Sequence, residues 1–237
     1  MPTVVFVSPK GGAGKTTAAL LLASEIARSA RVTVIDADPN HPIRAWSSSA
    51  APQNLTVVSD ADEENIIERI EEAAAQTPFV VVDLEGTAAK IVLLAVSQAD
   101  LVIVPTQGSQ LDAEQASRAI RVVKQHEKMS GRAVPYAVLL TRTNPIIRTR
   151  TMTHIQHGLI DAGIPVLHTE LHEREAFRAV FSFRQSLENL NPADVANLEK
   201  AIANAEAFAH EVIDRLRKGQ GSARSAQPEI HSDAKVA

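Results

Sequence analysis

The stretch Ser8-Pro9-Lys10-Gly11-Gly12-Ala13-Gly14-Lys15-Thr16-Thr17 decides the fold of this chain. The apolar run 4–7 before it is typical of a buried parallel strand, and the unbroken apolar stretch 18–23 after it predicts a helix. A glycine-rich turn between a strand and a helix attracts anions, because backbone N–H groups and the helix N-terminus point into it together. We therefore predict that this stretch binds phosphate groups.

Each part of the loop has its own physical role. Glycines at 11, 12 and 14 permit positive φ angles, which turn backbone N–H groups inward. Lys15 supplies a positive charge to the β- and γ-phosphates of a nucleotide, and the Thr16 hydroxyl is a ligand for Mg²⁺. The predicted nucleotide-binding residues of the loop are Gly11, Gly12, Ala13, Gly14, Lys15, Thr16 and Thr17.

The loop departs from the pattern G-x-x-x-x-G-K-[ST], because Pro9 stands where the first glycine belongs. The run from Lys10 to Thr16 resembles the deviant Walker A loop of the ParA/MinD family, in which a second, signature lysine occupies the position of Lys10. The resemblance implies ATP as the nucleotide. It also implies that Lys10 reaches across a nucleotide-sandwich homodimer to the phosphates of the partner subunit, so that Lys10 and Lys15 are both catalytic.

A second landmark follows the segment 31–35, which is typical of a buried strand. Asp36 and Asp38 follow it, and carboxylates at the carboxyl end of a parallel strand lie where open α/β sheets bind ligands. The segment 36–40 resembles the D-x-D-P-[QN] motif of the same family. The resemblance implies that Asp36 holds a water bound to Mg²⁺ and that Asp38 positions or polarises the attacking water. A strand-ending turn with solvated carboxylates is the alternative.

The segment 79–83 has the Walker B pattern, four apolar residues and then Asp83, whose carboxylate orients the ligand shell of Mg²⁺. With Thr16 and Asp36, Asp83 completes the predicted metal site, with the two aspartates acting through water. Relatives often continue D-x-P-P, whereas this chain continues Leu84-Glu85-Gly86. The role of Glu85 is therefore left open between a structural or solvated residue and a functional one.

Strands alternate with helices along the chain, which requires parallel pairing and right-handed crossovers. We predict an α/β fold with a doubly wound, mostly parallel sheet flanked by helices, as in P-loop NTPases. Residues 1–218 form one ATPase domain, with a last long helix opened by the segment 191–194, and residues 219–237 form a disordered polar tail. The chain has 237 residues, 45% of them hydrophobic, which is enough for one sizeable core.

Composition excludes several alternatives. The chain has no cysteine, so disulfides, thiolate zinc sites and iron–sulfur clusters are ruled out. No stretch approaches 18 uninterrupted apolar residues and no leader precedes the first strand, so we expect a soluble, cytoplasmic protein. The chain ends in a polar tail rather than a basic amphipathic helix, so no membrane anchor is expected.

Two further sites are predicted from weaker patterns. Asp112 follows a segment, 105–112, that resembles the ParA stretch leading into a long helix near the dimer interface, and it either caps that helix or serves the interface. Thr141 and Arg142 follow a strand whose end borders adenine in the family. Trp46 is read as a packing residue, and the histidine pairs 154/157 and 168/172 lack a third convergent metal ligand.

Residues 141–184 carry a net charge of +2 in a chain whose formal net charge is −4. ParA proteins bind duplex DNA without sequence preference through basic residues in this half of the chain. Ordinary solvated helix faces are the alternative. The candidate DNA-binding residues are Arg142, Arg148, Arg150, Arg174, Arg178 and Arg184.

The resemblance implies a small ParA-type ATPase without an N-terminal helix-turn-helix. Such a protein dimerises on ATP, binds non-specific DNA and associates with the nucleoid in that state. A centromere-binding or cargo adaptor protein then stimulates slow hydrolysis and release, which drives partition or cargo positioning. The alternatives are a MinD-like membrane or pole positioning ATPase, a plasmid-transfer accessory ATPase, and a metabolic ligase such as dethiobiotin synthetase.

Overall fold

A single parallel sheet forms the centre of the molecule in the computed structural model, which describes residues 1–85 and 89–225. The strand order is β3-β2-β4-β1-β5-β6-β7, and every paired strand is parallel to its neighbour. The strands are β1 (Thr3–Phe6), β2 (Val32–Ala37), β3 (Leu55–Val58), β4 (Phe79–Leu84), β5 (Leu101–Thr106), β6 (Tyr136–Thr143) and β7 (Leu171–His172).

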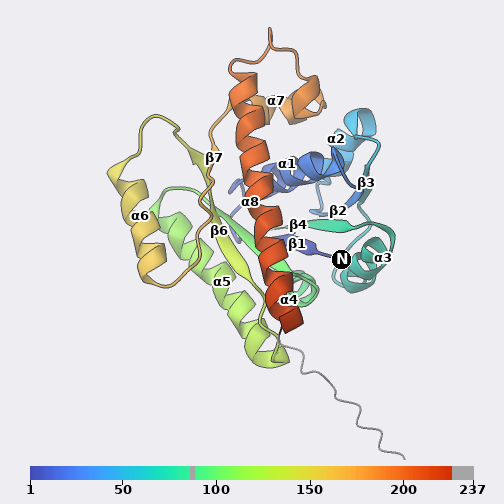
Figure 1. Ribbon diagram of the computed structural model, residues 1–237, viewed down its shortest axis with the longest axis vertical. Helices are drawn as coiled ribbons and strands as arrows, with labels where there is room; N and C mark the ends of the chain where they lie inside the picture. Colours follow the sequence, from blue (N-terminus) through green and yellow to red (C-terminus); the bar gives the residue numbers. More distant parts are fainter. Residues whose placement is uncertain (86–88, 226–237) are drawn as a thin grey trace, which may run out of the picture.

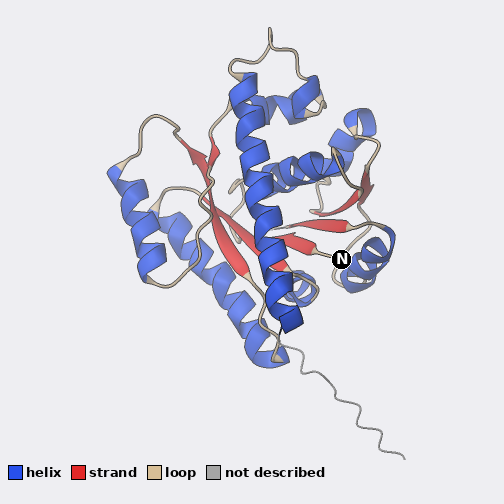
Figure 2. Cartoon of the chain, viewed as in Figure 1, coloured by secondary structure: helices blue, strands red, loops and turns tan. Residues whose placement is uncertain are grey.

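Helices cover both faces of this sheet (Figures 1 and 2). One hydrophobic cluster packs α1, α2, α7 and α8 on one face, and a second packs α3, α4, α5 and α6 on the other. The predicted doubly wound fold is confirmed. The helices are α1 (Lys15–Ala27), α2 (Pro42–Ala50), α3 (Ile66–Gln76), α4 (Ala89–Ser97), α5 (Gln110–Ser130), α6 (Arg150–Asp161), α7 (Glu175–Phe183), the 3-10 helix η1 (Leu187–Asn189) and α8 (Leu198–Ser225).

The central strands are apolar on both sides because helices bury both faces of the sheet. Val5 of β1, Val34 of β2 and Val81 of β4 are fully buried. Trp46 on α2 is 1% exposed, and its indole N–H donates to the Gln185 carbonyl oxygen at 2.9 Å. The packing role predicted for this tryptophan is confirmed.

Sheet register brings the predicted carboxylates together. β4 lies between β1 and β2, and Asp83 of β4 pairs with Asp36 of β2 on one side and with Phe6 of β1 on the other. Because all strands are parallel, the loops that follow β1, β2, β4, β5 and β6 leave from the same edge of the sheet. This edge holds the phosphate loop.

Two predictions about the C-terminal region are wrong. The last long helix begins at Leu198 rather than at Asn191, since the segment between them turns and Asn197 adopts a positive φ of 57° just before the helix. The helix also continues past residue 218 to Ser225, so the first part of the predicted disordered tail is helical. Residues 226–237 lie outside the described part of the chain, as does Gly86.

No helix within residues 1–85 and 89–225 is both long enough and apolar enough to cross a lipid bilayer.

Candidate nucleotide-binding site

The loop between β1 and α1 has the backbone geometry of an anion cradle. Gly12 and Gly14 adopt φ angles of 76° and 92°, which residues with a side chain rarely adopt. Gly14 caps α1 without a side-chain hydrogen bond, and its carbonyl oxygen accepts the Ala18 N–H at 2.9 Å. The first N–H groups of α1 therefore have no side-chain acceptor and can bind an anion.

Lys15 lies in the floor of this cradle. It is 8% exposed, and burial lowers the pKa of its ammonium group, while Asp83, Asp38 and Glu85 act in the opposite direction. A buried lysine surrounded by carboxylates is a point charge placed for a phosphate.

The two strand-end carboxylates are buried and only partly satisfied. Asp36 and Asp83 are both 0% exposed. Asp36 Oδ2 accepts the Arg44 N–H at 2.9 Å, but Asp36 Oδ1 and both Asp83 carboxyl oxygens have no hydrogen-bond partner among the described residues. Burial raises the pKa of Asp83 to about 7, and the negative charge of Asp36 adds to the shift, whereas the Thr16 hydroxyl and Lys15 oppose it.

Those oxygens fit a hydrated divalent cation. Carboxylate and hydroxyl oxygens are the ligands that Mg²⁺ prefers, and it usually keeps several waters. Buried carboxylate oxygens without partners are costly unless they bind such a group. The residues predicted for Mg²⁺, namely Thr16, Asp36 and Asp83, thus lie together at one sheet edge.

Asp38 lies at the turn after β2 and is half-buried. Its Oδ1 accepts hydrogen bonds from the backbone N–H of Asn40 at 2.9 Å and from the Asn40 side-chain amide at 3.0 Å. Its charge acts on Lys15 and Asp83, which places the carboxylate beside the cradle. The turn with a solvated carboxylate and the catalytic role both remain compatible with this position.

Lys10 lies outside its own cradle. Its Nζ forms an ion pair with Asp112 Oδ1 at 2.6 Å, and the side chain is 43% exposed whereas that of Asp112 is 5% exposed. Burial acts to raise the pKa of Asp112, but the hydrogen bonds from Lys10 and Ser109 outweigh it, so the pKa is lowered. Asp112 is consequently ionised and holds Lys10 at the rim of the site.

The expectation that Asp112 caps α5 is wrong. Ser109 is the N-cap residue, because its hydroxyl oxygen accepts the Asp112 N–H at 3.2 Å. The Ser109 hydroxyl also donates to Asp112 Oδ2 at 2.5 Å. Because Ser109 is the N-cap residue, the Asp112 carboxylate at the third position of the helix can bind Lys10.

Two more contacts tie the loop to neighbouring strands. The Gln107 side-chain amide donates to the Gly12 carbonyl oxygen at 2.7 Å, and the Thr141 hydroxyl donates to the Ala13 carbonyl oxygen at 2.8 Å. The loops after β5 and β6 thereby fix the shape of the phosphate loop. No sequence motif marks Gln107, because its partner is a main-chain carbonyl oxygen far away in the chain.

A cavity of about 330 Å³ opens beside Gly14. Thr141 and Arg142 line it, as predicted for the nucleotide base, although their contact with adenine stays a prediction. The other wall comes from β7 and α7, whose lining residues are Leu171, His172, Glu173, Arg174, Phe177, Arg178, Phe181 and Ser182. The strand β7 could not be predicted from the sequence, because a two-residue strand has no periodicity to detect.

His172 is held in the wall of this cavity by neutral partners. Its Nδ1 lies 2.7 Å from the Thr143 hydroxyl, and its backbone N–H donates to Asn204 Oδ1 at 3.0 Å. Among the described residues, no group of three or more His, Cys, Asp or Glu side chains is arranged to hold a metal ion.

The candidate DNA-binding arginines do not form one free surface. Arg148 pairs with Glu170 at 3.1 Å, Arg142 lies 3.7 Å from Glu173, and Arg178 pairs with Glu173 and Glu175. Arg174 is half-buried, whereas Arg150 and Arg184 are exposed. A DNA-binding role for these six residues stays a prediction.

A parallel sheet with this loop, two lysines and paired strand-end carboxylates defines a P-loop ATPase of the ParA/MinD class. The chain belongs to the VirC1 protein family, whose model matches residues 1–216. It is 37% identical over 218 residues to "Protein ParA" of Rhizobium radiobacter, a match that covers 91% of this chain and 98% of the relative. It is 32% identical over 187 residues to "Protein virC1" of Rhizobium rhizogenes, covering 76% and 80%.

Solved structures support the fold. A complex of Cyanothece McdA with ATP superposes with a TM-score of 0.69 over 90% of this chain and 96% of that one, at 16% identity. The family model and the ParA relative together confirm the family predicted from the loop sequence.

Proposed function

We propose that this chain is a ParA-type ATPase that dimerises on ATP, binds duplex DNA without sequence preference in that state, and is released when a partner protein stimulates hydrolysis. Partition of a plasmid or chromosome, or positioning of another cargo, is the resulting activity. The dimer associates with the nucleoid while ATP is bound.

The observation that carries this proposal is the contrast between the two lysines of the loop. Lys15 is buried inside the cradle, whereas Lys10 is nearly half exposed and is anchored outside it on Asp112. Lys10 therefore adds nothing to the phosphate site of its own chain. Once it leaves Asp112, this cation at the rim of one site can reach the phosphates of a second copy.

ATP and Mg²⁺ are the cofactors that the site fits. The loop residues 11–17 would hold the phosphates, and Thr16, Asp36 and Asp83 would hold the cation with its waters. When bound, Mg²⁺ neutralises charge on the phosphate oxygens.

The remaining chemistry belongs to the protein's own groups. Lys15 and the helix N-terminus stabilise negative charge on the phosphates, which is the main source of catalysis in phosphoryl transfer. Asp38, oriented by Asn40, is placed to hold a water near the phosphate end of the cradle. Lys10 of a second copy completes the charge, which makes hydrolysis depend on dimerisation.

The DNA step is tested by retention on random-sequence duplex with ATP, with ADP and without nucleotide, at about 0.15 M salt. We expect strong retention with ATP alone and its loss in Lys10→Ala. Lys90→Ala is the matched control, because Lys90 is an exposed surface lysine paired only with Glu63. Equal retention in all three nucleotide states, or an unchanged Lys10→Ala protein, contradicts the proposal.

A further inference from the structure

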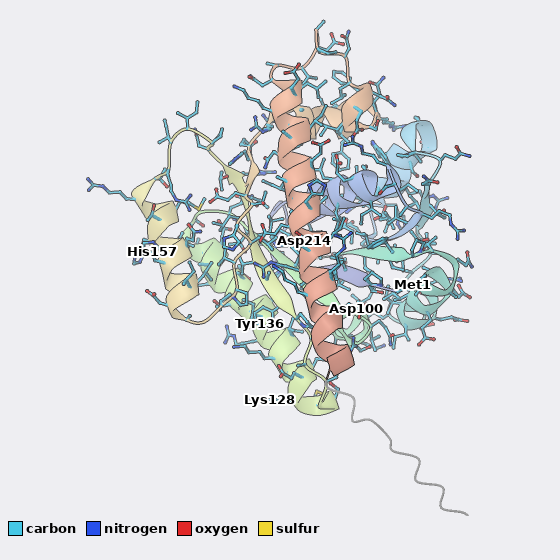
Figure 3. The ribbon with its side chains drawn as sticks, viewed as in Figure 1. Met1, Asp100, Lys128, Tyr136, His157 and Asp214 are labelled. Carbon is cyan, nitrogen blue, oxygen red and sulfur yellow. The ribbon has the colours of Figure 1, made fainter. Side chains whose placement is uncertain are left out.

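One face of α5 carries a row of cations. Arg118, Arg121, Lys124 and Lys128 are exposed, and they follow one another at intervals of three or four residues. Residues at these intervals share one side of a helix. Figure 3 labels Lys128 near the C-terminal end of α5. We name these four residues the α5 cationic row.

The row is not neutralised. None of its four side chains forms an ion pair with a carboxylate in residues 1–85 and 89–225. This distinguishes it from Arg142, Arg148 and Arg178, whose charges are paired with glutamates 170, 173 and 175. Cations that are already paired must break those pairs before they bind phosphates, whereas the row needs no such step.

Two acidic residues of α5 are exposed near the row. Glu114 lies one turn before Arg118, and Glu127 lies three residues after Lys124 and next to Lys128 in the chain. Asp161, at the end of α6, is exposed as well. The two glutamates lower the positive potential at the two ends of the row, and Arg121 in its middle has neither of them within one helical turn.

A groove runs beside the row between α5 and α6. It has a volume of about 380 Å³, with Arg118 and Arg121 on one wall and His154 on the other. Figure 1 shows the two helices side by side, and Figure 3 labels His157 on α6. The first two cations thus stand over a concave surface that can receive a phosphate group.

We propose that the α5 cationic row binds the phosphate backbone of duplex DNA, and that one nucleotide-free chain already does so weakly. The row is ~15 Å long at 1.5 Å per residue. A duplex carries one charge per ~1.7 Å of its axis, so that length faces roughly nine phosphates. An acidic protein fits less well, because a protein interface needs an apolar centre and Gln125, the exposed residue beside Lys124 and one turn after Arg121, is polar.

This inference deepens the proposed function, because it rests on duplex DNA as the ligand and names the surface that binds it. It does not depend on ATP or on a dimer. Each chain contributes the same four cations, so dimerisation doubles the number of contacts that the protein can make with DNA.

Salt dependence gives the expected size of the effect. Four phosphate contacts predict a slope of about −3.6 for log K against log salt, since each contact contributes about −0.9. Between 50 and 200 mM salt the nucleotide-free protein then loses affinity by roughly 150-fold. A variant with one remaining cation loses roughly three- to fourfold over the same range.

The test is fluorescence anisotropy of a labelled random-sequence duplex with nucleotide-free protein across this salt range. The row variant is Arg118→Gln, Arg121→Gln and Lys124→Gln together, because glutamine keeps helix propensity. The matched control is Arg69→Gln with Arg217→Gln, which removes paired surface charges outside the candidate DNA-binding residues and the nucleotide cavity. Circular dichroism verifies that both variants fold.

We expect the slope to shrink by about 2.7 in the row variant and by less than 1 in the control. An unchanged slope in the row variant, a wild-type protein that binds no duplex at 50 mM salt, or a control that weakens binding as much as the row variant would overturn the inference. Salt-sensitive binding to polyglutamate but not to duplex would overturn it in favour of an acidic protein.

The same assay with ATP separates this inference from the proposed function. If the row variant still shows ATP-enhanced binding, DNA binding by the α5 cationic row is refuted and the proposed function is not. Row-dependent binding that ATP does not change supports the row and contradicts the ATP-gated step.

Discussion

Replacing Asp112 by asparagine should release Lys10 and strengthen the ATP-bound dimer. Lys10 Nζ lies 2.6 Å from Asp112 Oδ1, so Lys10 cannot serve a second copy until this ion pair breaks. The substitution keeps the shape of the side chain and its bond to Ser109, and removes only the charge. The ion pair thus opposes dimerisation in the wild-type protein.

The structure sets the magnitude of this effect. Exposed ion pairs contribute 0–1 kcal/mol, whereas removing one partner of a buried pair costs about 3–5 kcal/mol. Because Asp112 is buried and Lys10 is nearly half exposed, we take the contribution of this ion pair as about 1 kcal/mol per chain. That corresponds to roughly fivefold per chain, and a symmetric dimer uses two chains, so the dimerisation constant should rise roughly 25-fold.

The assay is light scattering across a protein concentration series with saturating ATP. The dimer of Asp112→Asn should form at lower protein concentration than the wild-type dimer. In nucleotide-free buffer the same variant should melt roughly 2–4 °C lower. Glu114→Gln removes a carboxylate from the same helix, one that has no ion pair in the described part of the chain, and should change neither quantity. A dimerisation constant equal to or weaker than that of the wild type refutes the reasoning.

Three other predictions concern the cradle, the core and the C-terminal helix. Gly14→Ala should destabilise the protein by about 1–3 kcal/mol and abolish ATP binding, because the φ of 92° at this position strains any residue with a side chain. The control Gly158→Ala, at a helical position with open space around it, should stabilise the protein slightly. Calorimetry measures both effects. Trp46→Phe should lower the free energy of unfolding by about 1–3 kcal/mol in denaturant titration, since it removes the indole hydrogen bond to the Gln185 carbonyl oxygen and leaves a gap around a side chain that is 1% exposed. Burial alone would raise the pKa of Glu211, but the N–H groups of residues 168 and 169 hold it below its usual value. The wild-type protein should therefore be more stable than Glu211→Gln above the unfolded-state pKa of the carboxyl group. This difference in melting temperature should disappear as the pH falls below about 4.

The phosphate loop and the strand-end carboxylates were predictable because their signals are local. A glycine loop between an apolar strand and a helix can be recognised from one short stretch, and so can four apolar residues followed by Asp83. Parallel strands bring their carboxyl ends to one edge, so strand order was not needed to expect Asp36 near Asp83. The family resemblance rested on the same short segments.

Features that depend on distant contacts were not predictable. Ser109 and Asp112 are both good N-cap residues, and only Lys10, a hundred positions earlier, decides which one caps α5. β7 has two residues, and its backbone is fixed by the Asn204 side chain of α8 rather than by its own pattern. The cations of α5 look like Arg142, Arg148 and Arg178 in sequence, and only the folded chain pairs these three arginines with glutamates.

The central claim, that Lys10 acts on the site of a second copy, is tested most directly by mixing two inactive variants. The Lys10→Ala chain still has Asp38 beside its own nucleotide, and the Asp38→Ala chain still has Lys10, which can reach the site of the other chain. A mixed dimer therefore contains one complete site. Random pairing of equal amounts predicts recovery of roughly a quarter of wild-type ATPase activity, since half of the dimers are mixed and each has one working site. If the mixture is as inactive as either variant alone while mixed dimers are seen to form, Lys10 acts within its own chain and the account is wrong.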